Sequence, residues 1–307
     1  MNLRDLEYVV AVADHGSFSR AAAACSVSQP TLSGQIMKLE AELGLRLFER
    51  LGKTVRPEPR AESVIAEARA ALAAAAHVAA AARAARDPFA GPLRVGLIAT
   101  VAPYLLPLAL PAATKALPQT PLHLVEDITD RLIERMNDGA LDAAVIASDP
   151  ESARFAAIPL YEEPFYWVST RHERALRRKT ISVDEIDGKS LLLLAEGHCL
   201  RDQALALCGV AKGPAGADVR AMSLETIRHL AAAGQGATLA PLLAFTSWRR
   251  QSDDLQGLRV VGRGASRLVR LIRRRSSPRR AAIEALAGAL RASAEGALAA
   301  HGSPAAP

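Results

Sequence analysis

The sequence predicts an α/β protein built in three parts. Residues 1–58 repeat apolar side chains at helical spacing between short turns, which is typical of a small helical domain. Residues 60–86 are rich in alanine and contain neither glycine nor proline, so they predict one long helix. From residue 93 onward, short apolar runs alternate with helical segments, which indicates strands and helices in alternation. We therefore expect domains at residues 1–58 and 91–300, joined by a linker helix at 59–87.

Composition narrows the class of protein. The chain has 307 residues, half of them hydrophobic, which is enough for two or three domains with their own cores. Its three cysteines are too few for a disulfide framework and favour a reducing compartment. The first residues lack the apolar stretch of a secretion signal, and no uninterrupted apolar run reaches the roughly 20 residues that span a bilayer. We predict a cytoplasmic protein without a membrane partner. The net charge of +6 is compatible with an anionic partner.

Capping signals divide the first part into helices. An apolar face near the N-terminus predicts the first helix. Ser17 is placed to cap a second helix over residues 18–25, and Ser28 is placed to cap a third over Gln29–Leu43. Gly44 is expected to end the third helix, because glycine adopts the left-handed conformation at a helix end without strain.

The second and third helices have the short connection of a helix-turn-helix, whose last helix enters the major groove of DNA. Polar and small side chains at its start and along it suit base edges and phosphates: Ser28, Gln29, Pro30, Thr31, Ser33, Gln35 and Lys38. Two strands expected at residues 45–50 and 54–57 would form a wing, on which Arg50, Lys53 and Arg56 could hold phosphates. We predict that this part binds double-stranded DNA. The alternative is an ordinary three-helix domain with a polar face.

The linker helix at residues 59–87 carries a thin apolar stripe, in which side chains from Val64 to Val78 recur at helical spacing. A long exposed helix with such a stripe favours a partner helix, so we expect it to dimerise the protein. The alternative is that the stripe packs against its own chain. Residues 87–92 combine aspartate, proline and glycine, and they mark the boundary before the last part.

The last part predicts a domain of two lobes, residues 91–161 with 267–300 and residues 162–266. The expected strands are Leu93–Ile98, 122–125, Ala143–Ile146, 166–168, 191–194 and 268–272. One helix follows Thr100, and others are expected at Thr129–Asn137, 200–207, 223–233 and 281–298. This alternation implies a mostly parallel sheet, with ligands beyond the carboxyl ends of its strands. Thr100, Thr129 and His198 fall at such ends.

Two of the three cysteines, Cys199 and Cys208, lie in one segment with helical spacing. His198 precedes the first of them, and Arg201 follows it by two residues. A cysteine beside a cation at a helix start has a lowered pKa, and its thiolate is the form that oxidants attack. The alternative for both cysteines is a buried, inert thiol. We interpret the third, Cys25, as a packing residue of the first domain.

A second charged feature is the segment 267–280, which carries seven arginines and no acidic residue. A run of like charge is usually a solvated face, and that is the expectation here. Residues 1–60, by contrast, carry eight basic and seven acidic residues, so the DNA-binding part is close to neutral. We do not place the DNA site on the arginine run.

Several segments resemble a known family. Residues 3–8 (LRDLEY), 16–22 (GSFSRAA), 26–33 (SVSQPTLS) and 39–44 (LEAELG) are similar to the LysR-type transcriptional regulators. Residues 96–107 (GLIATVAPYLLP), 197–204 (GHCLRDQA) and 223–226 (SLET) resemble the peroxide-sensing members of that family. The resemblance runs from residue 1 to about residue 290.

The resemblance implies a winged helix-turn-helix, a linker helix and a two-lobed, periplasmic-binding-protein-like regulatory domain, in a homodimer or homotetramer. It implies that hydrogen peroxide oxidises Cys199, which then forms a disulfide with Cys208, and that the protein controls antioxidant genes, with RNA polymerase as a further partner. The implied peroxide pocket consists of Thr100, Thr129, His198 and Arg267. Asp218 departs from the histidine of some relatives, and residues 270–280 are more basic than the family implies.

Two other functions stay open at this point. The chain could be a LysR-type regulator that responds to a small organic effector bound between the lobes, with incidental cysteines. It could instead be a thiol peroxidase, against which the DNA-binding part argues. We predict a regulator rather than an enzyme. The spacing of His198, Cys199, Cys208 and His229 matches no recurrent zinc pattern, so no metal site and no cofactor are expected.

Overall fold

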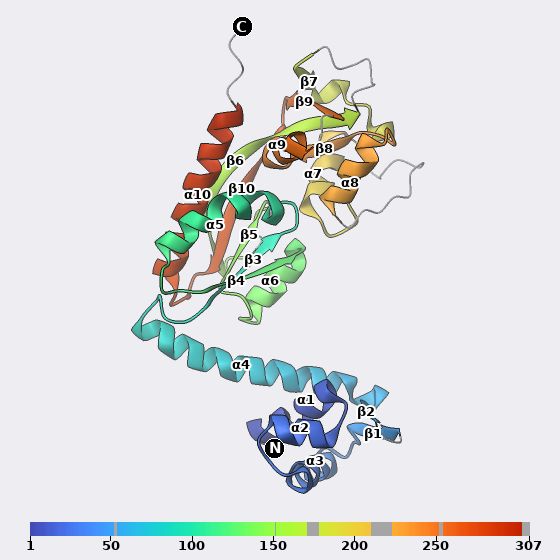
Figure 1. Cartoon of the computed structure of the whole chain (residues 1–307), viewed down its shortest axis with the longest axis vertical. Helices are drawn as coiled ribbons and strands as arrows, with labels where there is room; N and C mark the ends of the chain where they lie inside the picture. The colour runs from blue at the N-terminus through green and yellow to red at the C-terminus, as the bar shows by residue number, and fades with distance from the viewer. Residues whose placement is uncertain (52–53, 151, 171–177, 210–222, 252–253, 303–307) are drawn as a thin grey trace. The chain divides into compact units, whose positions relative to one another are not determined.

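The computed structural model describes residues 1–51, 54–150, 152–170, 178–209, 223–251 and 254–302 (Figure 1). Its contacts divide the chain into two compact units, Met1–Ala82 (unit 1) and Arg83–Pro307 (unit 2). Unit 1 has its own apolar core, and the core of unit 2 lies around a large mixed sheet.

Unit 1 contains the three predicted helices, α1 (Leu3–His15), α2 (Phe18–Ala24) and α3 (Gln29–Leu43). Ser17 and Ser28 cap α2 and α3, because each side-chain oxygen accepts a hydrogen bond from a backbone N–H in the first turn. Gly44 ends α3 with a φ of 64°, as the sequence predicted. The helices enclose an apolar core that includes Tyr8, Val12, Leu32, Ile36, Leu39 and Leu47.

The wing is an antiparallel pair of strands, β1 (Phe48–Leu51) and β2 (Thr54–Pro57). The first strand begins three residues later than the expected residue 45. Leu47 is fully buried among the helices, and its N–H donates to a carboxylate oxygen of Glu40 at 2.7 Å, so pairing starts only beyond it. Val55 N–H donates to the carbonyl oxygen of Gly16 at 3.1 Å, which attaches the wing to the helices.

The predicted linker helix is present as a short 3-10 turn (Pro59–Ala61) and α4 (Glu62–Arg86). Its first turns pack on unit 1 through Ala61 and Ile65, and Arg69 pairs with Asp14 at 3.2 Å. Further along, Val78 is 72% exposed. By length and composition alone the stretch Pro59–Arg86 could cross a membrane, since its mean hydropathy reaches 1.4 over 18 residues. One such helix is weak support for a membrane span.

Unit 2 is built on one mixed sheet in the order β4-β3-β5-β10-β6-β9-β7, with β8 also paired to β6. The strands are β3 (Leu93–Ile98), β4 (Leu122–Asp127), β5 (Ala143–Ile146), β6 (Phe155–Thr170), β7 (Thr180–Ser182), β8 (Thr238–Pro241), β9 (Leu255–Val261) and β10 (Ser266–Arg274). β3 runs parallel to β4 and β5, but β10 runs antiparallel to β5 and β6. The expected mostly parallel sheet is therefore wrong. Strands and helices alternate from β3 to β5, but in the described residues β6 follows β5 directly, and the strands β8 and β9 that flank α9 both run antiparallel to β6.

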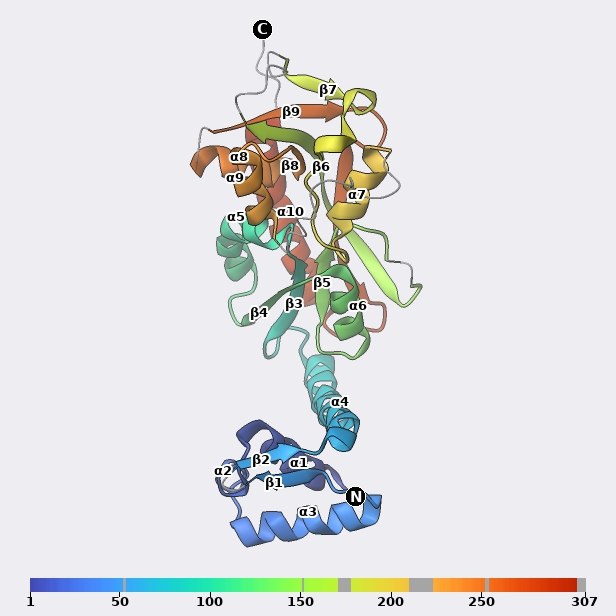
Figure 2. The same cartoon turned by 90° about the vertical axis from the view of Figure 1, so that its right-hand side faces the viewer.

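The long strand β6 joins the two predicted lobes (Figure 1 and Figure 2). Residues 155–164 of β6 pair with β10, and residues 165–170 pair with β8 and β9. The chain was expected to cross from the first lobe to the second near residue 161, and this point thus lies inside the single strand β6. In the first lobe, Val95 and Leu97 of β3 face the helices α5 (Ala102–Ala116) and α10 (Arg280–Gly302). Gly96 faces α6 (Thr129–Asn137), where a Cβ would lie 2.5 Å from Leu132 Cδ2.

The second lobe carries α7 (Cys199–Leu207), α8 (Leu224–Ala232) and α9 (Leu242–Gln251), with short 3-10 turns at Val183–Glu185 and Gly188–Ser190. The strand expected at residues 191–194 is wrong, because only isolated bridges form there, at Leu191 with Ala237 and at Leu194. A short buried apolar run does not distinguish a strand from a buried loop. The sequence also did not predict β7, β8, β9 and α9.

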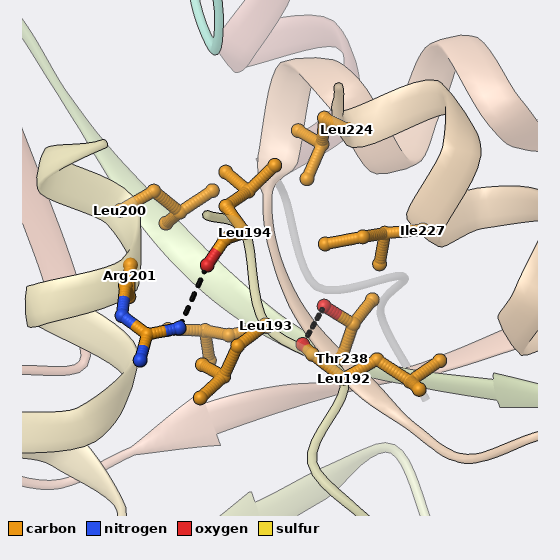
Figure 3. A pocket seen from close by; sticks show the side chains of 9 residues that line it. Leu192, Leu193, Leu194, Leu200, Arg201, Leu224, Ile227 and Thr238 are labelled. Carbon is orange, nitrogen blue, oxygen red and sulfur yellow. Dashed lines mark hydrogen bonds between the residues drawn. The ribbon is translucent and has the colours of Figure 1, made fainter. Parts of the chain in front are cut away.

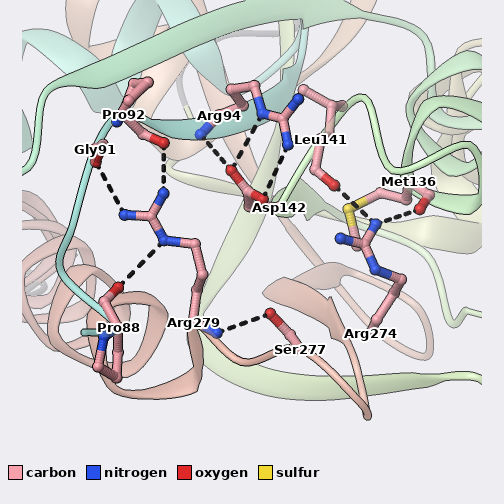
Figure 4. A network of polar contacts seen from close by, with 10 residues as sticks. All are labelled: Pro88, Gly91, Pro92, Arg94, Met136, Leu141, Asp142, Arg274, Ser277 and Arg279. Atoms are coloured by element: carbon pink, nitrogen blue, oxygen red, sulfur yellow. Dashed lines mark hydrogen bonds and ion pairs between the residues drawn. The ribbon is translucent and has the colours of Figure 1, made fainter. Parts of the chain in front are cut away.

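The arginine run is not a solvated face. The run covers most of β10 and reaches the first residue of α10. Within it, Arg267, Arg273 and Arg279 are buried. Arg279 donates to three backbone carbonyls of the segment that follows α4, those of Pro88, Gly91 and Pro92 (Figure 4). Arg274 donates to the carbonyls of Met136 and Leu141 beside the end of α6. A guanidinium has five N–H donors on an apolar stem, so it can satisfy carbonyls that no regular structure pairs.

Replacing Arg279 by methionine should destabilise unit 2 by about 2 kcal/mol, because three carbonyls lose a charged donor. Arg280 is the matched control, since it is exposed and pairs with exposed Glu284, so its replacement should cost less than about 0.5 kcal/mol. Urea unfolding followed by tryptophan fluorescence measures both, because Trp167 and Trp248 lie in unit 2. Equal losses in the free energy of unfolding of the Arg279 and Arg280 variants would contradict the role given to Arg279.

Candidate functional site

Three loops meet at the carboxyl edge of the parallel strands, as the sequence predicted for a ligand site. Thr100 follows β3, Thr129 follows β4 as the first residue of α6, and Ala147 follows β5. Because β3 runs parallel to β4 and β5, these loops leave the sheet at one edge. The second lobe brings the start of α7 to the same edge, where Cys199 faces Thr129 and the backbone of Ala147.

The turn before α7 places Cys199 at the first position of the helix, with His198 as the N-cap residue. Gly197 has a φ of 90°, and a Cβ there would lie 2.8 Å from Ile128 Cδ1, so the tight turn needs glycine. Leu200, Ala204 and Leu207 bury one face of α7 in the core. The thiol is therefore held at a helix start by packing on the opposite face of the same helix.

A buried ion pair lies beside the thiol. Glu163 of β6 and Arg267 of β10 are opposite each other across the two strands, and their side chains are 0% and 1% exposed. Glu163 Oε1 accepts from Arg267 Nε at 2.9 Å and from Nη2 at 2.7 Å. Arg267 also donates from Nη1 to Thr100 Oγ1 and from Nη2 to the Thr100 carbonyl, both at 3.0 Å. The pair thus fixes the arginine and the loop after β3 together.

Burial raises the pKa of the Cys199 thiol above its ordinary value, because a thiolate is poorly solvated inside the protein. The charge of Arg267, the Thr129 hydroxyl and the Ala147 backbone act in the opposite direction without cancelling the effect. The lowered pKa expected from the sequence is therefore wrong for the reduced, unliganded chain. The arginine was also misassigned: Arg201 donates to the Leu194 carbonyl at 2.8 Å (Figure 3), and Arg267 is the cation that acts on the thiol.

Several buried polar atoms around the thiol lack a partner. Among the described residues, His198 Nε2 and Gln203 Oε1 form no hydrogen bond, and Thr129 Oγ1 has only the weakly bonding thiol beside it. Burial lowers the pKa of His198, so its imidazole is neutral at physiological pH. An unpaired buried polar group costs about 1–3 kcal/mol, so a small polar molecule that paired these atoms would be favoured here.

Two residues of this site were missed by the sequence analysis. Gln203 lies one helical turn after Cys199, and its Nε2 donates to the Ala147 carbonyl at 2.8 Å. The spacing of four residues, which puts both side chains on one helix face, could have revealed it. Glu163 and its neighbour Glu162 interrupt the apolar pattern of β6, and carboxylates inside such a strand were the available signal.

The second cysteine of the segment, Cys208, ends α7 as its C-cap residue and is half-buried against the core. Burial raises the pKa of its thiol as well. All three cysteines are free thiols, and Cys25 packs against the core of unit 1 as predicted. Asp218, the departure noted in the sequence, lies outside the described residues.

An apolar cavity lies on the buried side of α7 (Figure 3). Its lining includes Leu193, Leu200, Leu224 and Ile227. The polar side chains that reach it are already bonded, since Thr238 donates to the Leu192 carbonyl at 3.1 Å and Arg201 donates to that of Leu194. None of the four residues predicted for the peroxide pocket lines this cavity.

The candidate DNA interface is the exposed side of α3. Thr31, Gln35 and Lys38 are exposed, and helical spacing puts them on one stripe beside the buried face that carries Leu32 and Ile36. Ser28, Gln29 and Pro30 are also exposed, whereas Ser33 is half-buried. Ser28 Oγ caps the helix and lies 2.7 Å from Thr31 Oγ1, so part of its bonding capacity is used within the protein. Lys53 and the side chain of Arg50 lie outside the described part of the chain.

Residues 3–62 match the bacterial regulatory helix-turn-helix of the lysR family, and residues 86–295 match the LysR substrate binding domain. The chain belongs to the LysR family of transcriptional regulators. The first match covers α1 to α3 and the wing of this LysR-type protein, and the second covers most of unit 2.

Relatives within the LysR family share nearly the whole chain. The DNA-binding transcriptional dual regulator OxyR of Escherichia coli K12 is 40% identical over 96% of this chain and 97% of its own. A full-length OxyR from Pseudomonas aeruginosa, with a cysteine replaced by aspartate, is similar in structure, with a TM-score of 0.68, 38% identity and 95% of each chain covered. A cysteine-to-serine variant of Corynebacterium glutamicum OxyR with bound H2O2 gives a TM-score of 0.65 at 34% identity, covering 98% of this chain and 95% of its own.

Because burial raises the pKa of Cys199, its alkylation by iodoacetamide should reach half its maximal rate above the ordinary value of 9.0. The folded chain holds this proton more tightly than the unfolded chain does. The thiol therefore contributes to the free energy of unfolding below a pH of about 9, and this contribution is lost as the pH rises through the raised pKa. Peptide mass spectrometry at a series of pH values measures the rate, with the urea-unfolded chain as reference. A midpoint below that of the unfolded chain would contradict the assignment.

Proposed function

We propose that this LysR-type protein senses hydrogen peroxide through Cys199 and responds by forming a disulfide with Cys208. The observation that carries the proposal is the cluster of unpartnered buried polar atoms around one thiol, beside a buried arginine. Hydrogen peroxide is small, and it both donates and accepts hydrogen bonds. The names of the relatives support the same function, since one of them is described with bound H2O2.

The proposed chemistry needs two steps. The Cys199 thiolate attacks one oxygen of the peroxide, so that an S–O bond forms and the O–O bond breaks. The leaving hydroxide takes up a proton and departs as water, and Cys199 becomes a sulfenic acid. The Cys208 thiolate then attacks that sulfur, the S–S bond forms, and the S–O bond breaks with loss of a second water. Two thiols and one peroxide thus give one disulfide and two waters.

Each pocket residue has a role in the first step. Thr129, whose hydroxyl lies beside the thiol, and Thr100, which binds Arg267, would hold the peroxide through their hydroxyls, and the neutral His198 can accept or donate a hydrogen bond to it. Arg267 carries the positive charge that stabilises the thiolate. Gln203 is an additional candidate, because its free Oε1 can accept a hydrogen bond from the peroxide.

The second step requires a rearrangement. Nine helical steps of about 1.5 Å separate the Cα atoms of Cys199 and Cys208 by roughly 13 Å, whereas a disulfide needs them within about 7 Å. Part of α7 must therefore unwind before the bond can form. In the proposed mechanism this helix is the element with two states, and its loss changes the regulatory domain.

The other parts of the chain would carry the response to DNA. We propose that residues 1–58 bind promoter DNA, that the helix at 59–87 dimerises the protein, and that residues 91–300 form the regulatory domain of a dimer or tetramer. The thin stripe of α4, with Val78 exposed, supports the dimerising role. RNA polymerase is the partner through which such a regulator would act, in the cytoplasm.

A small organic effector is the less supported alternative. Such an effector would bind between the lobes, whereas the apolar cavity behind α7 is lined by residues of the second lobe, and the polar side chains that reach it already bond backbone carbonyls. A thiol peroxidase would use the same cysteine, but it would go on consuming peroxide when a reductant is supplied. The two alternatives therefore give different outcomes in one experiment.

Brief exposure of the full chain to micromolar peroxide should remove two hydrogens across Cys199 and Cys208, because they form a disulfide. The oxidised protein should also give a changed footprint on promoter DNA. Cys199→Ser should abolish both changes while leaving DNA binding intact, and Cys25→Ser is the matched control that should keep both. A peroxide response in Cys199→Ser equal to that of the unmodified chain would contradict the redox proposal. Consumption that stops after one equivalent of peroxide favours a sensor, and continued consumption favours a peroxidase.

Gln35→Ala should cost about 1–3 kcal/mol of binding free energy at particular base pairs, because its exposed amide is placed to read a base edge. Arg56→Ala on the wing should instead weaken binding to all sequences and reduce the salt slope by about one, because it loses a phosphate contact. Titrations on operator and random DNA at several salt concentrations separate the two effects. Equal losses on both DNAs for Gln35→Ala would refute its role in base reading.

A further inference from the structure

We propose that Glu163 competes with Cys199 for the charge of Arg267, and that this competition keeps the thiol protonated and slow to react in the resting protein. The inference rests on the proposed function of Cys199, and it assigns to Glu163 a positioning role that acts through Arg267. Two anionic groups, one carboxylate and one thiolate, would share a single buried cation in this site.

The geometry favours the carboxylate. Glu163 uses both of its oxygens inside the protein: Oε1 accepts two hydrogen bonds from Arg267, and Oε2 accepts one from Leu243 N–H at 3.1 Å. Leu243 lies in the first turn of α9, where backbone N–H groups are free to bind an anion. The carboxylate is therefore held from two sides. Arg267 is held on its other side by Thr100, so its guanidinium cannot turn towards the thiol without breaking these bonds.

The charges around the thiol give the same result. Cys199 is flanked by Arg267 from β10 and by Asp202 from its own helix, and the acidic groups near Arg267 are Glu163 and Tyr161 of β6 and Cys199 itself. His198 is neutral. Because Glu163 already neutralises Arg267, a thiolate would be a second buried anion with only a shared counter-charge. Removing the carboxylate would leave the thiolate as the natural partner of the arginine.

The main test is the full chain with Glu163→Gln. Glutamine keeps the size of the side chain but removes its charge, and its single oxygen cannot serve both Arg267 and Leu243. We expect the pH midpoint of Cys199 alkylation by iodoacetamide to fall by about one unit, measured by peptide mass spectrometry. A fall of one unit raises the thiolate fraction about tenfold at neutral pH. The weaker nucleophilicity of the less basic thiolate reduces the gain in rate to about three- to fourfold.

Two variants separate charge from packing. Glu163→Asp keeps the charge and shortens the side chain, so its midpoint should stay near that of the unmodified chain even if stability falls. Asp142→Asn breaks another largely buried carboxylate–arginine pair, with Arg94, and should destabilise unit 2 without moving the midpoint of Cys199. An unchanged or higher midpoint in a folded Glu163→Gln protein would overturn the proposal. A shift of the midpoint in Glu163→Asp as large as that in Glu163→Gln would also overturn the proposal.

If Glu163→Gln does not fold, the pair can be removed together. Glu163→Gln combined with Arg267→Met leaves no unpaired buried charge and should be less destabilised than the single Gln variant. Its midpoint should equal that of Arg267→Met alone, because Glu163 acts only through the arginine. A lower midpoint in the double variant would refute that route. Alkylation involves no peroxide, so a chain that failed to form the disulfide would disprove the proposed function without affecting this comparison.

Discussion

The buried ion pair between Glu163 and Arg267 is the interaction on which the site depends. It joins β6, the strand that runs between the lobes, to β10, and it reaches the loop after β3 through Thr100 and the start of α9 through Leu243. A buried pair of this kind adds little net stability compared with apolar residues, but breaking it leaves an uncompensated charge. Its value is positional: it holds one cation at a defined place beside a thiol, in a region where the surrounding protein disfavours any charge.

The same use of arginine recurs through the run 267–280. Connections between helices and strands leave backbone carbonyls that have no partner in the sheet, and helix ends leave others. Arg274 and Arg279 donate to such carbonyls from one side of the first lobe. The high arginine content of this segment is therefore explained by the backbone that it must satisfy. A basic composition that resembles a nucleic-acid surface is here part of the interior.

Local signals explain what the sequence could predict. Unit 1 was predicted nearly complete because Ser17, Ser28 and Gly44 are caps, and a cap acts on the residues next to it. The strands and helices from β3 to α6 followed from alternation, and that placed Thr100 and Thr129 at one edge. The pKa of Cys199 was predicted in the wrong direction because burial is a property of the whole fold. Likewise, Arg201 was close in sequence, whereas Arg267 is close in space and could be connected to Cys199 only through the resemblance to the family.

The buried polar groups around Cys199 cost free energy in the resting chain, and this cost indicates what the site is for. The neutral His198 and the amide of Gln203 each leave a buried polar atom without a partner, and the thiol is kept from ionising. A molecule that paired these atoms would recover about 1–3 kcal/mol for each of them. Such a molecule would need both to donate and to accept hydrogen bonds. In the proposed mechanism the ligand is also the oxidant, so binding and reaction select for the same molecule. In that mechanism the intact helix keeps Cys208 out of reach of Cys199, so α7 must unwind before the disulfide can form.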